Sequence, residues 1–231
     1  MKYNYLSSNY EKLIEEIKIK CDRLKRNFEE IKLVAVSKTF PPGQILEVNK
    51  LGHKDFGENK VQELMRKYDE LKTYDINWHL VGHLQTNKVK YIIEYVYLIH
   101  SVDSFKLALE INKRAEEINR VVDILVQVNT SKEEQKSGIE INETKSLCSE
   151  IAKLNRIKLK GLMTIGKFTD NEKIIRENFK SLRNLYEDLK PYHPGFQFLS
   201  MGMTSDFEIA LEEGSNMLRV GSAIFGERNY N

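Results

Sequence analysis

The chain has little of what marks secreted, membrane-spanning or nucleic-acid-binding proteins. Cys21 and Cys148 are its only cysteines, and each falls in a helical pattern, which favours buried, reduced thiols in a cytoplasmic protein. Lysine plus arginine (36) nearly balances aspartate plus glutamate (34), so we expect no nucleic-acid partner. No apolar run approaches membrane-spanning length, and the first residues lack the apolar stretch of a signal peptide, so we expect no membrane partner.

Linker segments are also missing. No stretch rich in proline, glycine or serine divides the chain, and we therefore expect one domain over residues 1–231. This length is normal for a single α/β barrel, and an apolar fraction of 41% is sufficient for a core.

Strand-like apolar runs alternate with helical stretches along the chain. Eight runs have strand character: 33–37, 55–58, 78–81, 98–102, 121–128, 159–164, 196–200 and 218–220. Apolar residues recur at helical spacing between them, most clearly from Ile174 to Leu189. The alternation predicts parallel strands joined by helices. Eight such units favour a closed (β/α)8 TIM barrel over a doubly wound sheet, which remains the alternative.

An additional helix precedes the first strand. Ser8 and Glu11 have the spacing of a capping box at its start. Apolar residues follow on one face: Leu13, Ile17, Cys21, Leu24 and Phe28. We expect residues 1–30 to form a helix that packs against the barrel.

Lys38 stands at the end of the first predicted strand. The apolar run Leu33 to Val36 is typical of a strand buried on both faces, and Pro41 and Pro42 stop it. A lysine at this position is partly withdrawn from water. Desolvation lowers the pKa of its ammonium group, and the neutral amine can condense with a carbonyl. The alternative is a lysine that extends into solvent.

The segments after the last two strands have the composition of a phosphate site. In barrels of this class the active face is at the carboxyl ends of the strands, and phosphate commonly binds after strands 7 and 8. We expect it at the Ser200 hydroxyl and at the amides of Gly221 and Ser222. A capping box at 205–208 predicts a helix start there, but its two carboxylates oppose an anion. A purely structural turn is the alternative at Gly221.

Two other constellations are weaker. His79 and His83 have the spacing of a zinc-binding helix, but Leu80 replaces the required glutamate and the surrounding apolar run favours a strand. We therefore expect no metal site. Ser37 next to Lys38 resembles a serine–lysine hydrolase pair, but adjacent strand residues point to opposite faces.

Taken together, these segments resemble the pyridoxal phosphate homeostasis protein family, single-domain relatives of the alanine racemase barrel. The matching segments run in consistent order: 34–38, 56–63, 78–88, 161–164, 199–206 and 219–226. One position departs from the family pattern. Thr204 stands where the family often has serine, which keeps the hydroxyl.

The resemblance implies a fold like the alanine racemase N-terminal domain and a specific set of cofactor contacts. Lys38 would carry pyridoxal 5′-phosphate covalently, as a Schiff base, and Arg219 would face the pyridine nitrogen. The phosphate would be held by Ser200, Gly221 and Ser222. The remaining pocket residues would be Asn59, His83 and Met163.

An arginine opposite the pyridine nitrogen keeps that nitrogen unprotonated, which makes the ring a poor electron sink. Two-base racemisation also needs a second acid–base group, which alanine racemases take from another domain and a partner subunit. Only six residues follow Phe225, and we expect no such domain. We therefore expect a carrier in intracellular vitamin B6 homeostasis that stores, buffers or delivers the cofactor, with little turnover of its own.

The alternatives are a weak amino-acid racemase or other pyridoxal-phosphate enzyme, and a lysine Schiff-base aldolase. Apo forms of pyridoxal-phosphate enzymes are the candidate recipients. We expect a monomer or a weak homodimer.

Overall fold

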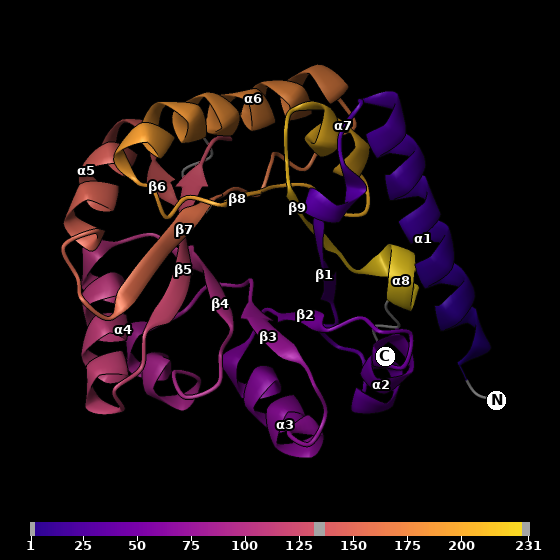
Figure 1. The fold of residues 1–231 in the computed structure, drawn as a ribbon, viewed down its shortest axis with the longest axis horizontal. Coiled ribbons are helices and arrows are strands. Elements are labelled where there is room, and N and C mark those ends of the chain that lie inside the picture. Colours follow the sequence, from indigo (N-terminus) through magenta and orange to yellow (C-terminus); the bar gives the residue numbers. More distant parts are fainter. Residues whose placement is uncertain (1–2, 132–136, 228–231) are drawn as a thin grey trace.

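β1 (Lys32–Val36) lies between β2 (Asp55–Glu58) and β9 (Met217–Val220), and every strand pairing is parallel. The computed structural model describes residues 3–131 and 137–227. The sheet continues through five further strands: β3 (Asn77–Leu80), β4 (Leu98–Val102), β5 (Val122–Asn129), β7 (Ile157–Met163) and β8 (Phe198–Ser200). Because β4 also pairs with β5, these strands close into the barrel drawn in Figure 1.

The closed eight-stranded barrel confirms the predicted fold class, since each expected strand matches one of these eight. β6 (Ile139–Glu140) was not expected. It pairs beyond the barrel, with Val128 and Asn129 at the end of β5. Two residues are too few to show a sequence period.

Helices cover the outside of the barrel (Figure 1). Their bounds are α2 (Pro42–Asn49), α3 (Val61–Leu71), α4 (Phe105–Glu117), α5 (Ile141–Ile151), α6 (Glu172–Leu189), α7 (Phe207–Glu212) and α8 (Ser222–Phe225). Three short 3-10 helices are η1 (Phe28–Glu30), η2 (Thr86–Tyr91) and η3 (Lys190–Tyr192). No helix in the described residues has the length and apolar character needed to cross a membrane.

The additional helix α1 (Asn4–Arg23) packs against α2, α7 and α8, as expected of a helix docked on the barrel. The predicted end at residue 30 was wrong: Lys25 has a φ of +55°, which stops the helix, so Leu24 and Phe28 lie beyond α1. It begins before the predicted capping box, so Ser8 lies inside the helix and that prediction was wrong. The apolar face extends further toward the amino end than the capping signal indicated, because Leu6 is fully buried. Burial of this face decides where the helix starts.

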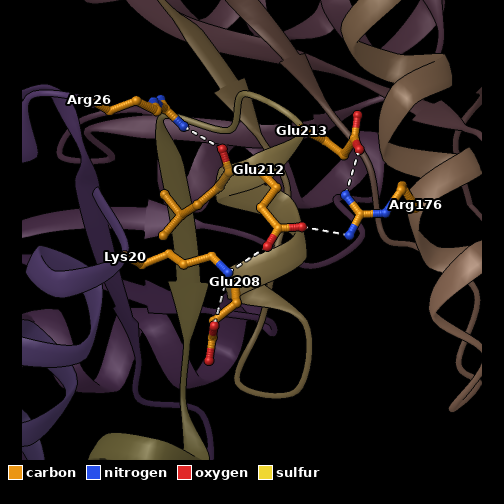
Figure 2. A network of polar contacts seen from close by, with 7 residues as sticks. Lys20, Arg26, Arg176, Glu208, Glu212 and Glu213 are labelled. Atoms are coloured by element: carbon orange, nitrogen blue, oxygen red, sulfur yellow. Dashed lines mark hydrogen bonds and ion pairs between the residues drawn. The ribbon is translucent and has the colours of Figure 1, made fainter. Parts of the chain in front are cut away.

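Ion pairs join the short α7 to two longer helices (Figure 2). Lys20 on α1 lies 3.1 Å from Glu208 and 2.5 Å from Glu212. Arg176 on α6 pairs with Glu212 at 2.5 Å and with Glu213 at 2.8 Å. These contacts fix α7 against α1 and α6.

The core has two layers. The larger one lies between the strands and the helices. The smaller one fills the barrel and consists of Val34, Val36, Val81, Leu98, Leu125, Met163 and Met217. Along β1 the side chains alternate between the layers, since Leu33 and Ala35 belong to the outer layer. The strand is therefore buried on both faces, as its apolar run predicted.

Candidate functional site

A cavity of about 540 Å³ lies at the carboxyl ends of the strands. Its polar lining comes from four separate segments of the chain: Lys38, Asn59, Thr204, Ser205, Arg219 and Ser222. Gly82 and Gly221 bring backbone to its surface, and Ile165 and Phe168 contribute apolar groups. Phe168 is 95% exposed, so the cavity has an uncovered aromatic residue at its edge.

Lys38 lines this cavity together with Val36, and it is half-buried. The residue between them points the other way. Ser37 is fully buried, and its hydroxyl donates to Glu58 Oε1 at 2.7 Å. The structure therefore confirms that Ser37 and Lys38 occupy opposite faces, which removes a serine–lysine pair as a reading of this segment.

The turn that carries Lys38 packs against the segment after β9. Phe40 N donates to Ser37 O at 3.0 Å and closes the turn. The Phe40 ring stacks on Phe225 of α8, with ring centroids 5.1 Å apart. This contact holds the lysine-bearing turn next to the segment that contains Gly221.

Arg219 is the buried cation of the cavity, with 5% of its surface exposed. Its Nη1 donates to Ser200 Oγ at 2.7 Å, and its Nη2 donates to Thr164 O at 2.7 Å. Both acceptors are neutral. Burial lowers the pKa of Arg219 to about 10, which leaves the guanidinium protonated at neutral pH. The cavity thus has a fixed positive charge oriented by two hydrogen bonds.

Gly82 allows the segments after β2 and β3 to approach closely. A Cβ atom at this position would lie 2.2 Å from Asn59 O. Ser101 Oγ donates to Gly82 O at 2.6 Å and holds the glycine peptide in place. The position of Asn59 at the cavity therefore depends on the missing side chain of Gly82.

The turn before α7 supplies hydroxyl groups. Thr204 and Ser205 line the cavity, and Thr204 Oγ1 accepts a hydrogen bond from Ala223 N at 3.4 Å. The predicted capping box is wrong, since the N-cap is Asp206 and not Ser205. The Asp206 carboxylate turns back and accepts from Met203 N at 2.6 Å.

The two acidic residues expected to oppose an anion here are both engaged elsewhere. Asp206 bonds to its own turn, and Glu208 pairs with Lys20. Burial raises the pKa of Asp206 above its usual range, so its carboxylate is more easily protonated.

Five of the residues predicted for the site line this cavity together: Lys38, Asn59, Arg219, Gly221 and Ser222. The other three lie elsewhere. Met163 belongs to the barrel interior, and Ser200 is fully buried against Arg219. The His83 side chain is 56% exposed and lies 3.9 Å from Asp103, although its neighbour Gly82 lines the cavity.

Residue-by-residue reasoning missed Thr204 and Ser205 as cavity residues. The available signal was the hydroxyl of Thr204 within the segment that resembles the family. His79 lies on β3, as its apolar surroundings predicted, and not on a helix.

Comparison with known proteins agrees with the barrel and its cavity. Residues 14–229 match the family model of the alanine racemase N-terminal domain. The pyridoxal phosphate homeostasis protein of Aquifex aeolicus is 44% identical, with 95% of this chain and 96% of that protein covered. The chain belongs to the pyridoxal phosphate homeostasis protein family. The Escherichia coli member of the same name is 36% identical, with 98% of each chain covered.

Solved structures show the same fold. PipY of Synechococcus elongatus, solved with pyridoxal phosphate bound, has a TM-score of 0.80 and 32% identity, and covers 91% of this chain and 100% of its own. An unknown protein from Bifidobacterium adolescentis has a TM-score of 0.91 and 33% identity, and the match covers 95% of this chain and 94% of that one. Alanine racemase from Clostridium difficile, at 16% identity and a TM-score of 0.76, shares the fold over 57% of its length.

Proposed function

We propose that this protein binds pyridoxal 5′-phosphate in the cavity at the carboxyl ends of the strands and acts in intracellular vitamin B6 homeostasis. It stores, buffers or delivers the cofactor. The observation that carries the proposal is the single cavity of about 540 Å³ that Lys38, Arg219 and the hydroxyls of Thr204, Ser205 and Ser222 line together. PipY, which is 32% identical, was solved with pyridoxal phosphate bound.

The donor set fits the three polar parts of the cofactor. Lys38 offers a primary amine for the aldehyde, and when bound the cofactor forms a covalent bond with such an amine. Arg219 offers a cationic donor for the ring nitrogen. Thr204, Ser205 and the segment at Gly221 offer hydroxyls and backbone for the phosphate. The Ser200 hydroxyl, predicted as a phosphate contact, accepts from Arg219 and does not line the cavity.

Arg219 also supports a carrier over an enzyme. Its pKa of about 10 keeps it protonated at neutral pH, so it acts only as a hydrogen-bond donor. A ring nitrogen that receives this donor stays unprotonated, and the ring then withdraws electrons poorly. The relatives are named as homeostasis proteins. We infer that turnover of amino acids is weak, and that Asn59 positions the cofactor without catalysing a reaction.

We also propose a compartment and partners for this protein. Cys21 and Cys148 are buried free thiols, as in proteins of reducing compartments, which supports a cytoplasmic location. Apo forms of pyridoxal-phosphate enzymes are the proposed recipients. The proposed assembly is a monomer or a weak homodimer, without nucleic-acid or membrane partners.

The direct test is the absorbance of the purified protein titrated with pyridoxal phosphate. We expect a yellow band at one cofactor per chain and its absence in Lys38→Ala, with both proteins equally stable. An aldolase that uses Lys38 directly on sugar phosphates gives no yellow band. A stereochemical assay with several amino acids separates carrier from racemase, and rapid racemisation by the loaded protein contradicts the carrier proposal.

A further inference from the structure

Two side chains of α3 hold the peptide groups on either side of Lys38. Lys67 Nζ donates to Ser37 O at 2.8 Å, on the amino side of Lys38. Glu63 Oε1 accepts from Thr39 N at 2.6 Å, on the carboxyl side. Lys67 and Glu63 also bond to each other at 2.8 Å. One turn of α3 therefore fixes the backbone that carries the lysine from both directions.

Lys67 is fully buried, which is an uncommon environment for a lysine. Its third partner is Glu58 Oε1, at 2.6 Å, and that carboxylate also accepts from Ser37 Oγ at 2.7 Å. Burial raises the pKa of Glu58, while the charge of Lys67 acts in the opposite direction. Apolar residues of similar volume usually stabilise a core as well as a buried ion pair does, so stability alone does not account for this cluster.

The backbone at Thr39 also needs external support. Its φ is +72°, in the left-handed region that β-branched residues rarely adopt. The residue before it points into the cavity, so a relaxed Thr39 would redirect Lys38. Glu63 holds the Thr39 N–H directly and thereby stabilises the left-handed conformation.

We propose that Glu63 and Lys67 are positioning residues for Lys38, which fix the turn at 37–39 so that the lysine amine enters the cavity. This inference rests on the proposed function, since it concerns the same cavity. α3 does not line the cavity, and through these two residues it acts only on the covalent step. Binding of the ring and the phosphate stays with Arg219 on β9 and with the segments after β8 and β9.

The test compares two ligands that differ only in the group that meets Lys38. Pyridoxal 5′-phosphate carries the aldehyde, and pyridoxine 5′-phosphate carries a hydroxymethyl group in its place. Binding of both is measured by calorimetry for the wild type, Lys67→Met, Glu63→Ala and Glu63→Gln. Leu147→Ala, a core substitution on α5, controls for lowered stability because α5 packs against β5 and β7 and not against β1.

We expect Lys67→Met and Glu63→Ala to bind pyridoxal phosphate about tenfold more weakly, because each variant loses one of the two charged-group hydrogen bonds that hold the turn at 37–39. Binding of pyridoxine phosphate should change by less than about twofold. Glu63→Gln keeps an oxygen acceptor for the Thr39 N–H and should retain most of the aldehyde-dependent affinity. Leu147→Ala should lower Tm and leave both affinities unchanged.

The outcomes separate this inference from the proposed function. Equal losses for the two ligands, or no loss for either, overturn the positioning role while leaving the cofactor site intact. If the wild type binds neither ligand, the proposed function fails and the inference fails with it. Should Lys67→Met not fold, the two Glu63 variants decide the question by themselves.

Discussion

β1 has a lysine at its first position and another just beyond its end, and the two lie in opposite surroundings. Lys32 lies 3.1 Å from Asp55, and its side chain also approaches the ring of Tyr97. Lys38 lines the cavity at the other end of the barrel. The same residue type therefore serves an internal ion pair at the amino end and a ligand-facing surface at the carboxyl end.

The amino end of the barrel pairs its polar groups with one another. Asp55 accepts from Lys32 and bonds to His79 Nε2 at 2.9 Å, and His79 Nδ1 bonds to His100 Nε2 at 2.9 Å. Burial alone would raise the pKa of Asp55, but His79 and Lys32 together hold it well below its ordinary value. The two histidines are fully buried, which lowers the pKa of each and keeps both neutral.

At the carboxyl end, the buried charge that lines the cavity is not paired with an acidic side chain of the described residues. Arg219 contacts the neutral oxygens of Ser200 and Thr164 and also lines the cavity. The two ends of the barrel therefore differ in whether a buried charge can meet a ligand. Charged groups that pair with one another have their donors and acceptors already occupied, whereas a buried charge oriented by neutral groups is prepared to meet a ligand.

The largest effect is expected from a side chain added at Gly82, where the segments after β2 and β3 lie close together at the cavity. A methyl group at Gly82 would collide with Asn59 O, so Gly82→Ala should lower the free energy of unfolding by about 2 kcal/mol and weaken cofactor binding. Urea denaturation and a cofactor titration measure the two effects. In Gly43→Ala the new Cβ meets only the Tyr3 ring, at 3.7 Å, and this control should be neutral or slightly stabilising. Unchanged cofactor affinity in Gly82→Ala would mean that Asn59 is dispensable.

Acid should act chiefly on the amino end. The pKa values of His79 and His100 are lowered in the folded state, so stability present above about pH 6.5 is lost as the pH falls and the unfolded chain takes up protons. Each such histidine adds a slope of up to about 1.4 kcal/mol per pH unit. Between pH 6.5 and 5, the free energy of unfolding of His100→Gln should depend less steeply on pH than that of the wild type, by up to one proton. A slope equal to that of the wild type would show that His100 is protonated in the folded protein.

The smallest effect is expected at the ion pairs that fix α7 (Figure 2). Glu212→Ala removes partners from both Lys20 and Arg176, in a partly exposed setting, and should lower stability by about 0.5–1 kcal/mol at low salt. Denaturation at high salt should show less of this loss. Cofactor affinity should stay within about twofold of the wild type, because Glu212 lies outside the cavity. A tenfold loss would place α7 among the elements that shape the phosphate segment.

The strands could be predicted from sequence because a parallel barrel gives each strand a continuous apolar run bounded by polar residues. Lys38, Asn59 and Gly221 lie within two residues of a strand end, and all three line the cavity at the carboxyl ends of the strands. Ser200 illustrates the limit. Its hydroxyl accepts from Arg219, a contact that the sequence did not indicate, because the sequence period does not fix the face of a side chain on a three-residue strand.

Helix starts were predicted less well, and for a related reason. Ser8 and Ser205 both begin capping-box patterns, yet α1 and α7 start elsewhere. In α1 the burial of Leu6 extends the helix, and before α7 the Asp206 carboxylate bonds back to Met203 N. At α1 a tertiary contact overrides the capping signal, and before α7 a competing local hydrogen bond does so. The α3 cluster around Lys67 left no sequence signal, because a lysine at helical spacing looks like any solvated one.

The central claim is that Lys38, and not the lysine at the other end of β1, carries the cofactor. One measurement tests it most directly: peptide mass mapping after one equivalent of pyridoxal phosphate and borohydride reduction, on the wild type, Lys38→Ala and Lys32→Ala. We expect a single adduct on Lys38 in the wild type and in Lys32→Ala, and none in Lys38→Ala. An adduct on Lys32, or one that persists in Lys38→Ala, would contradict the account.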